Sequence, residues 1–377
     1  MLAPAVVALA VPAYGLAQPA TILVATDAVI IDLPPLPGAT SSAAVAINDH
    51  GQVAGTSGSV SGFPHAVIWD HGTVTDLGIL PGGTQSFATA INNRGQVVGF
   101  GDTPSGQQHA FRWEDGTMTD LGALEEGGSG VARTINNRGQ VVGEGETAAT
   151  GTTHATIWQD GSVIDVGAGV AFSNNERNQV VGYTNAAPGA ILWDRGITTR
   201  LGTILGGGFS LATDINNRTQ IVGWSDTAFN TSRAFLWEDG TLTDIGTFGG
   251  DAGFSIANAI NDRGQVVGVA STTTPGHNHA FLWERGTMRD LGTLPGGTSS
   301  EAVAINRRGQ VAGGSDSSTG GSAFLWENGT MVDLRITGVG GLQSLNNRGE
   351  VVGQHTTSSG ETHGALWTTR DRHDDDR

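Results

Sequence analysis

Five histidines are the first candidates for chemistry, because an imidazole can bind a metal ion or move a proton near neutral pH. They occupy one position of a repeated unit: His65, His109, His154, His279 and His363. Equivalent positions on separate repeats lie too far apart to share one ion, whose ligands must approach it to within about 2–2.5 Å. We therefore interpret this column as a structural hydrogen-bonding position, and we expect neither a metal nor another cofactor.

A second column is diverse where most repeat positions are uniform. It directly follows a repeated Val-Val-Gly segment, and its members in chain order are Thr56, Phe100, Glu144, Tyr183, Trp224, Val269, Gly314 and Gln354. Aromatic faces can stack on sugar rings and other flat ligands. Phe100, Glu144, Tyr183 and Trp224 are therefore our candidate ligand-binding residues. The alternative is that these rings pack against loops of their own repeat.

Polar residues also interrupt a segment that is otherwise small and apolar in each repeat. These variants are Arg133, Asp214, Asn258, Glu301 and Gln343. A carboxylate pair such as Asp214 and Glu301 could exchange protons or hold a cation if the fold brought the two groups together. Solvated polarity along a channel is the other interpretation. Acidic residues near one loop position leave weak calcium binding open as well: Asp102, Glu146, Asp226 and Asp316.

The composition excludes several classes of protein. The 377 residues include no cysteine, which removes disulfide scaffolds, thiolate zinc sites and thiol nucleophiles. The 36 acidic and 19 basic residues give a net charge of −17, and such a chain is repelled by a nucleic-acid backbone. No serine-elbow, phosphate-loop or zinc-helix motif occurs. We therefore expect a binding protein that does not contact nucleic acid.

Two elements recur eight times and must position these residues. The first reads Ala-Ile-Asn-Asn-Arg-Gly-Gln-Val-Val-Gly, and its central asparagines are Asn48, Asn92, Asn136, Asn175, Asn216, Asn261, Asn306 and Asn346. The second is an apolar segment that ends in tryptophan, followed by a turn and Asp-Leu-Gly. Its tryptophans are Trp69, Trp113, Trp158, Trp193, Trp237, Trp283, Trp326 and Trp367. We interpret the tryptophans as packing anchors between neighbouring units and the asparagines as turn caps.

Each unit of about 43 residues divides into four short strands. In the second unit we expect them at 86–92, 96–101, 109–113 and 117–121, with left-handed glycines in type I turns at Gly95 and Gly116. The connections between strands 1 and 2 and between strands 3 and 4 keep a constant length in the units that carry them, whereas the other two vary. All insertions therefore fall on one face of the molecule.

Repeats of four antiparallel strands predict an all-β fold, a β-propeller with one sheet per blade. The last unit supplies only three strands, and the missing fourth is expected at 28–33. Pairing of these two ends would close an eight-bladed β-propeller of four-stranded antiparallel blades over residues 18–369. An open stack of repeats is the alternative.

The segments His109-Ala110-Phe111 and His279-Ala280-Phe281, each followed by x-Trp, resemble the HAF-repeat family of bacterial extracellular repeat proteins. The resemblance extends to the Asp-Leu-Gly-x-Leu-Pro-Gly-Gly loop at 290–297 and covers nearly the whole chain after residue 17. Three units have Gly189, Arg233 or Ser322 in place of the histidine, and four have Val67, Thr156, Ile191 or Ala365 in place of the phenylalanine. The resemblance implies an extracellular location and a repeat architecture, and it carries no reaction with it.

The two ends of the chain predict its location. Residues 1–17 form an uncharged apolar run that ends in a small-x-small pattern, so we expect a secretory signal; a short strand is the alternative, and two prolines argue against a membrane anchor. The charged residues 370–377 are expected to be disordered. These features predict a secreted or periplasmic monomer without a membrane span, which presents its variable face to an extracellular or envelope polysaccharide or protein. The alternative is a propeller hydrolase or lyase that acts on a carbohydrate or an ester through channel carboxylates.

Overall fold

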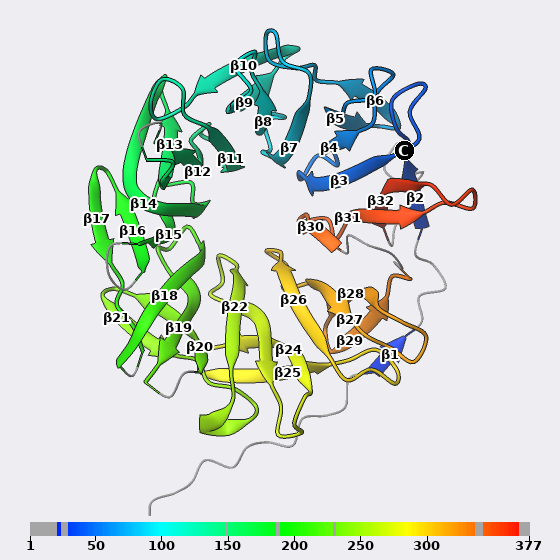
Figure 1. Cartoon of the computed structure of the whole chain (residues 1–377). Helices are drawn as coiled ribbons and strands as arrows, with labels where there is room; N and C mark the ends of the chain where they lie inside the picture. The colour runs from blue at the N-terminus through cyan, green and yellow to red at the C-terminus, as the bar shows by residue number, and fades with distance from the viewer. Residues whose placement is uncertain are drawn as a thin grey trace, which may run out of the picture.

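The computed structural model describes residues 21–23, 29–147, 150–185, 189–204, 206–228, 231–335 and 342–368. Within these ranges the chain is built of β-strands, with one short 3-10 turn, η1 (Gly250–Ala252). The strands surround a central opening (Figure 1). No helix in the described part of the chain has the length and apolar character needed to cross a bilayer. The predicted signal at 1–17 and the charged tail at 370–377 lie outside the described residues.

The strands form seven sheets. Apart from β1 and β2, all paired strands are antiparallel and neighbours along the chain are neighbours in the sheet. The first two contain β3 (Ser42–Ile47), β4 (Val53–Ser57), β5 (His65–Asp70) and β6 (Thr73–Asp76), then β7 (Ser86–Ile91), β8 (Val97–Asp102), β9 (Gln108–Glu114) and β10 (Thr117–Gly122). Two more contain β18 (Gly206–Ile215), β19 (Ile221–Thr227), β20 (Ser232–Glu238) and β21 (Thr241–Asp244), then β22 (Ser255–Ile260), β23 (Val266–Ser271), β24 (Asn278–Glu284) and β25 (Thr287–Gly292). The first strand of each set lies nearest the central opening (Figure 1).

Another sheet contains β26 (Ser300–Ile305), β27 (Val311–Ser315), β28 (Ser322–Glu327) and β29 (Thr330–Asp333), with β1 (Thr21–Leu23) parallel to β29 at its edge. The last repeat supplies β30 (Leu342–Leu345), β31 (Val351–Thr356) and β32 (Thr362–Thr368). Its fourth strand is β2 (Val29–Leu33), which pairs with β32 from Val29 opposite Thr368 to Leu33 opposite Gly364. The predicted closure by a strand from the amino-terminal region is therefore confirmed.

The remaining sheet has seven strands because two repeats are fused in it. It runs through β11 (Gly130–Ile135), β12 (Val141–Glu146), β13 (Thr153–Gln159), β14 (Ser162–Asn174), β15 (Val180–Thr184), β16 (Ala190–Asp194) and β17 (Ile197–Arg200). The first half of β14 pairs with β13 and its second half with β15. The connection at this point is the shortest of its kind in the chain. The outer strand of one repeat therefore continues directly into the inner strand of the next.

A ring of hydrogen bonds connects all eight repeats around the axis. The side-chain amide of each repeated asparagine donates to the backbone carbonyl of the corresponding asparagine in the next repeat, at 2.8–3.0 Å. The ring closes when Asn346 donates to the carbonyl of Asn48. Each side-chain oxygen also caps its own turn, as predicted: that of Asn216 accepts from the N–H groups of Arg218 and Gln220. The asparagines therefore join the repeats as well as shaping them.

The hydrophobic core consists of eight clusters, and each lies between two neighbouring repeats. One cluster joins the last repeat to the first through Leu33, Trp69 and Leu366. Every cluster contains one of the repeated tryptophans, either buried or packed against its edge. The prediction that the tryptophans anchor neighbouring sheets is therefore confirmed, and no single core holds the ring together.

The turn between strands 1 and 2 has the predicted left-handed residue. Gly95 has a φ of 76°, and Asn178 and Thr219 occupy the same position of their repeats with φ of 61° and 66°. A β-branched residue is unfavourable there. The Thr219 hydroxyl donates to Gln179 Oε1 at 2.9 Å and accepts from the Arg177 guanidinium at 3.0 Å, and these bonds to the preceding repeat offset the strain.

The hairpin turn between strands 3 and 4 differs from the type I turn that we predicted. Both Asp115 and Gly116 are left-handed, with φ of 49° and 83°. This is a type I′ geometry, whose backbone twist matches the right-handed twist of the two flanking strands. The constant length of this hairpin follows, because a two-residue I′ turn accepts no insertion without changing its type.

Candidate functional site

A β-bulge interrupts every inner strand at one equivalent position. The register shifts by one residue in all eight repeats. The extra residues are Val45, Thr89, Arg133, Phe172, Thr213, Asn258, Val303 and Gln343. Thr89, Thr213 and Asn258 donate to a carbonyl of the next repeat at 2.8–2.9 Å. Bulges change the direction of side chains and are frequent next to functional sites. Arg133 and Phe172 are the bulge residues of two adjacent repeats.

Four aromatic rings form a continuous row across two repeats. The Phe172 ring stacks on Tyr183 with centroids 5.9 Å apart, and Tyr183 meets Phe209 edge-on at 5.7 Å. Phe209 in turn contacts Trp224 at 5.6 Å. All four rings are partly exposed. The candidate residues Tyr183 and Trp224 are thus brought together through a third ring.

The row ends in a pair of charged side chains from the preceding repeat. The Arg133 guanidinium lies over the Phe172 ring, 5.5 Å from its centroid, and donates to Glu144 Oε1 at 2.8 Å. This side chain of Arg133 is 40% exposed and that of Glu144 is 23% exposed, so both remain accessible to solvent. We call the six residues Arg133, Glu144, Phe172, Tyr183, Phe209 and Trp224 the aromatic arc.

Phe100, the fourth candidate, lies one repeat earlier in the same column. Its ring stacks on Phe87 of the adjacent inner strand, with centroids 5.1 Å apart, and both rings are partly exposed. Phe100 therefore packs within its own repeat, as the alternative interpretation proposed, although on a strand and not on a loop. Phe100 lies on the same side of the propeller as the arc, but its described aromatic contact is with Phe87 and not with a member of the arc.

Two local features produce the arc, and sequence reasoning missed both. Phe172 is a bulge residue, and the bulge was not predicted. β18 begins at Gly206, four residues before Ser210, where its continuous pairing with β19 starts. Phe209 lies in this extension of the strand. The only sequence signal was that phenylalanine replaces a small or polar residue at these places.

The opposite half of the ring carries small side chains and an open cavity. Val269, Gly314 and Glu301 line a pocket of about 400 Å³ between repeats six, seven and eight. A Cβ atom built on Gly314 would meet nothing within 4 Å. Glu301 accepts from Asn258 Nδ2 at 2.8 Å. These two predicted channel residues thus form one contact, remote from the arc in the chain.

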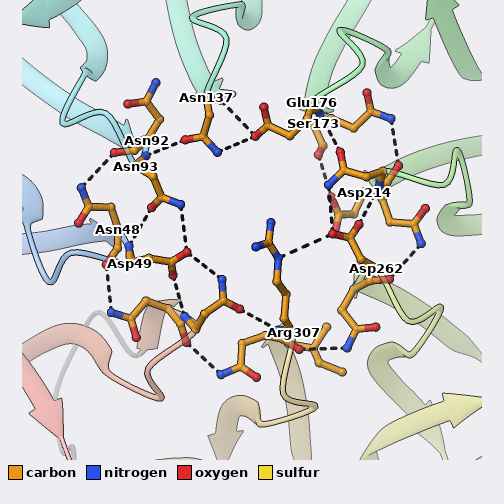
Figure 2. A pocket seen from close by; sticks show the side chains of 18 of the residues that line it. Asn48, Asp49, Asn92, Asn93, Asn137, Ser173, Glu176, Asp214, Asp262 and Arg307 are labelled. Carbon is orange, nitrogen blue, oxygen red and sulfur yellow. Dashed lines mark hydrogen bonds and ion pairs between the residues drawn. The ribbon is translucent and has the colours of Figure 1, made fainter.

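A second cavity, of about 340 Å³, lies on the axis of the ring, where the turns between strands 1 and 2 of the repeats converge. Figure 2 shows the asparagine ring on its wall and Arg307 extending toward its centre. Arg307 forms a long ion pair with Asp262, Nε to Oδ2 3.7 Å. Burial alone would raise the pKa of Asp49 in this wall, but hydrogen bonds from Asn347 and Asn93 and the charge of Arg307 lower it overall. Isoleucines and one leucine at the ends of the inner strands also line the cavity, and the polar groups of the wall largely bond to one another.

Asp214 also lines this axial cavity. Its carboxylate accepts from the Ser173 hydroxyl at 2.8 Å and from the N–H groups of Ile215 and Ile260 at 2.9 and 3.0 Å. Burial raises the pKa of Asp214 above its ordinary value, and the nearby charge of Asp262 adds to this, whereas the three hydrogen bonds oppose it. The three donors come from three consecutive repeats, so the carboxylate links its own repeat to both neighbours.

The polar variants of the inner strands do not form one acid–base site. Asp214 lies in the axial cavity, Glu301 lies with Asn258 at the pocket of about 400 Å³, and Arg133 belongs to the arc. Gln343 is exposed on β30. Asp214, Glu301 and Arg133 therefore lie at three different places and do not form a shared catalytic site.

Two of the four acidic loop residues that left calcium binding open have a structural role. Asp102 accepts from the N–H groups of Thr84 and Gln85 and from the Thr84 hydroxyl. Asp316 accepts in the same way from Thr298 and Ser299. Burial would raise the pKa of both carboxyls, but these hydrogen bonds lower it. Both carboxylates therefore fold the glycine-rich loop beside them.

The repeated histidines pair with the repeated aspartates within their own repeats. Nδ1 of His65, His109, His154 and His279 lies 2.8–3.0 Å from the aspartate eleven residues later, on the outer strand. Where the histidine is replaced, Arg233 and Ser322 still bond that aspartate. In the unit with Gly189 the aspartate is lost as well, to Arg200. The histidine column is thus a hydrogen-bonding position, as predicted. The joint replacement of the histidine and the aspartate in one unit was a sequence signal that the two residues are partners.

The substitution His109→Ser should change the free energy of unfolding by less than about 1 kcal/mol, because exposed pairs contribute little and serine already serves at position 322. Asp120→Ala should cost about 1–2 kcal/mol, because it also removes the acceptor of the Gly122 N–H. Urea denaturation of the two variants measures both values. A larger loss for His109→Ser than for Asp120→Ala would contradict this assignment.

Comparisons with known proteins support the fold alone. No protein-family profile and no curated protein sequence matches the chain. Among solved structures, the chain is similar to the β-propeller domain of the Trilobed protease from Pyrococcus furiosus, described as having an open velcro topology: the TM-score is 0.50 at 11% identity, over 78% of this chain and 97% of that one. It is also similar to prolyl endopeptidases, with a TM-score of 0.51 at 11% identity over 73% of this chain and 49% of that one. The chain spans about half the length of that second structure. The chain therefore has a β-propeller fold.

Proposed function

We propose that this protein is a secreted, non-enzymatic eight-bladed β-propeller of the HAF-repeat type that binds an extracellular or envelope polysaccharide. The observation that carries the proposal is the aromatic arc, a row of four partly exposed rings that ends in an Arg133–Glu144 pair. The count of eight blades treats the seven-stranded sheet as two blades joined through β14, and the eight-membered asparagine ring supports that count. Secretion rests on the apolar segment at 1–17.

The chemistry of the arc suits a sugar chain. Pyranose rings present apolar C–H faces that stack on aromatic side chains, and their hydroxyl groups exchange hydrogen bonds with charged side chains at the edge of the platform. Rings that support one another are held in place before the ligand arrives, which reduces the entropy lost on binding. The row crosses adjacent repeats, so it can accommodate more than one sugar unit.

The alternative, a propeller hydrolase or lyase, has weaker support. A glycosidase needs two carboxyl groups at opposite sides of the scissile bond, about 5–10 Å apart. Asp214 is committed to three hydrogen bonds in the axial cavity, and Glu301 lies at a different pocket. Glu144 is the one acidic member of the arc, and it is paired with Arg133.

The experiment is a glycan array probed with the purified chain and with the double variant Tyr183→Thr, Trp224→Val. Threonine and valine occupy the same column in other repeats, at Thr56 and Val269, so the fold should accept them. A matched control, Val269→Thr, alters the same column on the opposite half of the ring. We expect the wild type and the control to bind one class of polysaccharide and the double variant to bind it at least about tenfold more weakly, because aromatic hot spots contribute about 2 kcal/mol or more.

Equal binding by the double variant would remove the arc as the site. If no glycan bound the wild-type chain, the polysaccharide proposal would fail, and a protein would become the expected ligand. Turnover of a bound glycan by the wild-type chain would favour the enzyme.

A further inference from the structure

We propose that Asp32, His355 and His363 form a site for a divalent transition-metal ion such as Zn²⁺, and that the ion locks the closure of the ring. The three residues come from β2, β31 and β32, so they belong to all three outer strands of the last repeat. Their ligand atoms lie within 4.8 Å of one another, and this is the one such group of three in the described part of the chain.

The geometry is already close to that of a bound ion. His355 Nε2 lies 2.8 Å from Asp32 Oδ1, and His363 Nδ1 lies 2.9 Å from the same oxygen. Two imidazole nitrogens and a carboxylate oxygen that coordinate one zinc ion at about 2.0–2.2 Å are separated by about 3.3 Å in a tetrahedral arrangement. Small side-chain shifts would therefore open room for the ion without a change of backbone.

His355 distinguishes this repeat from the other seven. It stands directly across the strand pair from His363, whereas the residues at its position in the other repeats are small: Ser57, Gly101, Gly145, Thr184, Ser225, Ala270 and Ser315. A second imidazole is not needed for the histidine–aspartate pair, since four other repeats form that pair without one. Its addition creates a two-histidine, one-carboxylate donor set of the kind that binds Zn²⁺ and related ions.

The site is accessible and correctly charged. The side chains of His363, His355 and Asp32 are 12%, 22% and 45% exposed, which leaves a path for the ion and a fourth coordination position for water. A neutral imidazole offers one nitrogen lone pair to an ion and keeps its proton on the other nitrogen, so each histidine can supply one ligand atom.

The location gives the ion a structural purpose. β2 continues along the chain into the first repeat, but it is held to the last repeat by noncovalent contacts, which include its pairing with β32. Asp32 is its one described side chain with ion pairs to that repeat. An ion bound to Asp32 and both histidines would cross-link β2 to β31 and β32. Because the ion binds only when these strands are assembled, it shifts the unfolding equilibrium toward the closed ring.

The test is isothermal titration of the EDTA-treated full chain with ZnCl₂, together with thermal unfolding in the presence and absence of Zn²⁺. His355→Ser restores the residue of three other repeats and is expected to fold. His109→Ser removes a histidine from a pair without a second imidazole and is the matched control. We expect one ion per wild-type or His109→Ser chain and a rise of a few degrees in the unfolding midpoint. The affinity should fall at least tenfold in His355→Ser, and the rise in midpoint should disappear.

A second variant, Asp32→Asn, keeps a hydrogen-bond acceptor but removes the negative charge, and it should also lose at least tenfold in affinity. Circular dichroism of each variant without metal establishes that the fold is intact. Two results would overturn the proposal: no binding of Zn²⁺ to the wild-type chain, or equal affinity in the wild-type and His355→Ser chains.

Discussion

A chain that lacks residues 1–33 is expected to lose at least about 4 kcal/mol of its free energy of unfolding. The deletion removes β2, whose Leu33 is 4% exposed and packs in the cluster that joins the last repeat to the first. Burial of one leucine contributes about 1.5–3 kcal/mol, and the backbone groups of β32 that pair with β2 would become an unpaired sheet edge. Guanidinium denaturation measures the loss.

The matched control for this deletion begins at Val29 and retains the whole of β2. Its free energy of unfolding should lie within about 1 kcal/mol of that of the full chain, because it keeps the Leu33 packing and every β2–β32 pair. Of the described strands it loses only β1, a three-residue strand at a sheet edge that the longer deletion loses as well. If both shortened chains were equally stable, β2 would not close the ring. The longer deletion should also associate in solution, since unpaired strand edges pair with other chains.

The substitution Asn216→Asp is expected to destabilise the protein by about 3–5 kcal/mol at pH 7. Asn216 is 4% exposed, and its amide donates to the carbonyl of Asn261 and to Gln220 Oε1. A carboxylate keeps the two acceptor bonds but loses both donors, and it places a buried negative oxygen against the Asn261 carbonyl.

The effect of Asn216→Asp should depend on pH in a defined direction. Burial beside oxygens raises the folded-state pKa of the introduced carboxyl above its unfolded value of about 3.9. The loss of stability is therefore fully present above the folded pKa and shrinks as the pH falls toward the unfolded pKa. Urea denaturation at pH 7 and pH 5 measures the difference.

Asn328→Asp is the matched control for this substitution. Asn328 is a left-handed turn residue with φ of 50°, and Asp115, Asp160 and Asp239 occupy the same turn position in other repeats. The control should change the free energy of unfolding by less than about 0.5 kcal/mol at both pH values. Equal changes in the free energy of unfolding for the two substitutions would show that the hydrogen bonds of the asparagine ring do not stabilise the fold.

The arrangement of strands was predictable because the repeats reveal it. Eight copies of one pattern place every turn and strand, and a last repeat with three strands requires its fourth from elsewhere in the chain; Val29–Leu33 fills that place. The merging of two repeats through β14 was not predicted, although the short connection before Asn174 was visible. A short connection shows that the loop carries no insertion, but it does not determine whether the chain turns there or stays extended.

The candidate site was predictable in part. Tyr183 and Trp224 emerged from a column that breaks the repeat, and the structure joins both to Phe209. Phe209 and Phe172 were missed because a bulge and a strand extension orient them, and neither follows from hydrophobic periodicity. His355 was missed because its importance depends on Asp32, which lies 323 residues away in the chain.

Hydrogen–deuterium exchange with the strongest glycan from the array tests most directly where this protein binds its ligand. We predict slower exchange in peptides that cover 169–184 and 206–227, which hold the four rings of the arc, and unchanged exchange in 255–271 and 300–315 on the opposite half of the ring. Slower exchange confined to the hairpins around Asn48, Asn92 and Asn216 would place the ligand in the axial cavity and contradict the account.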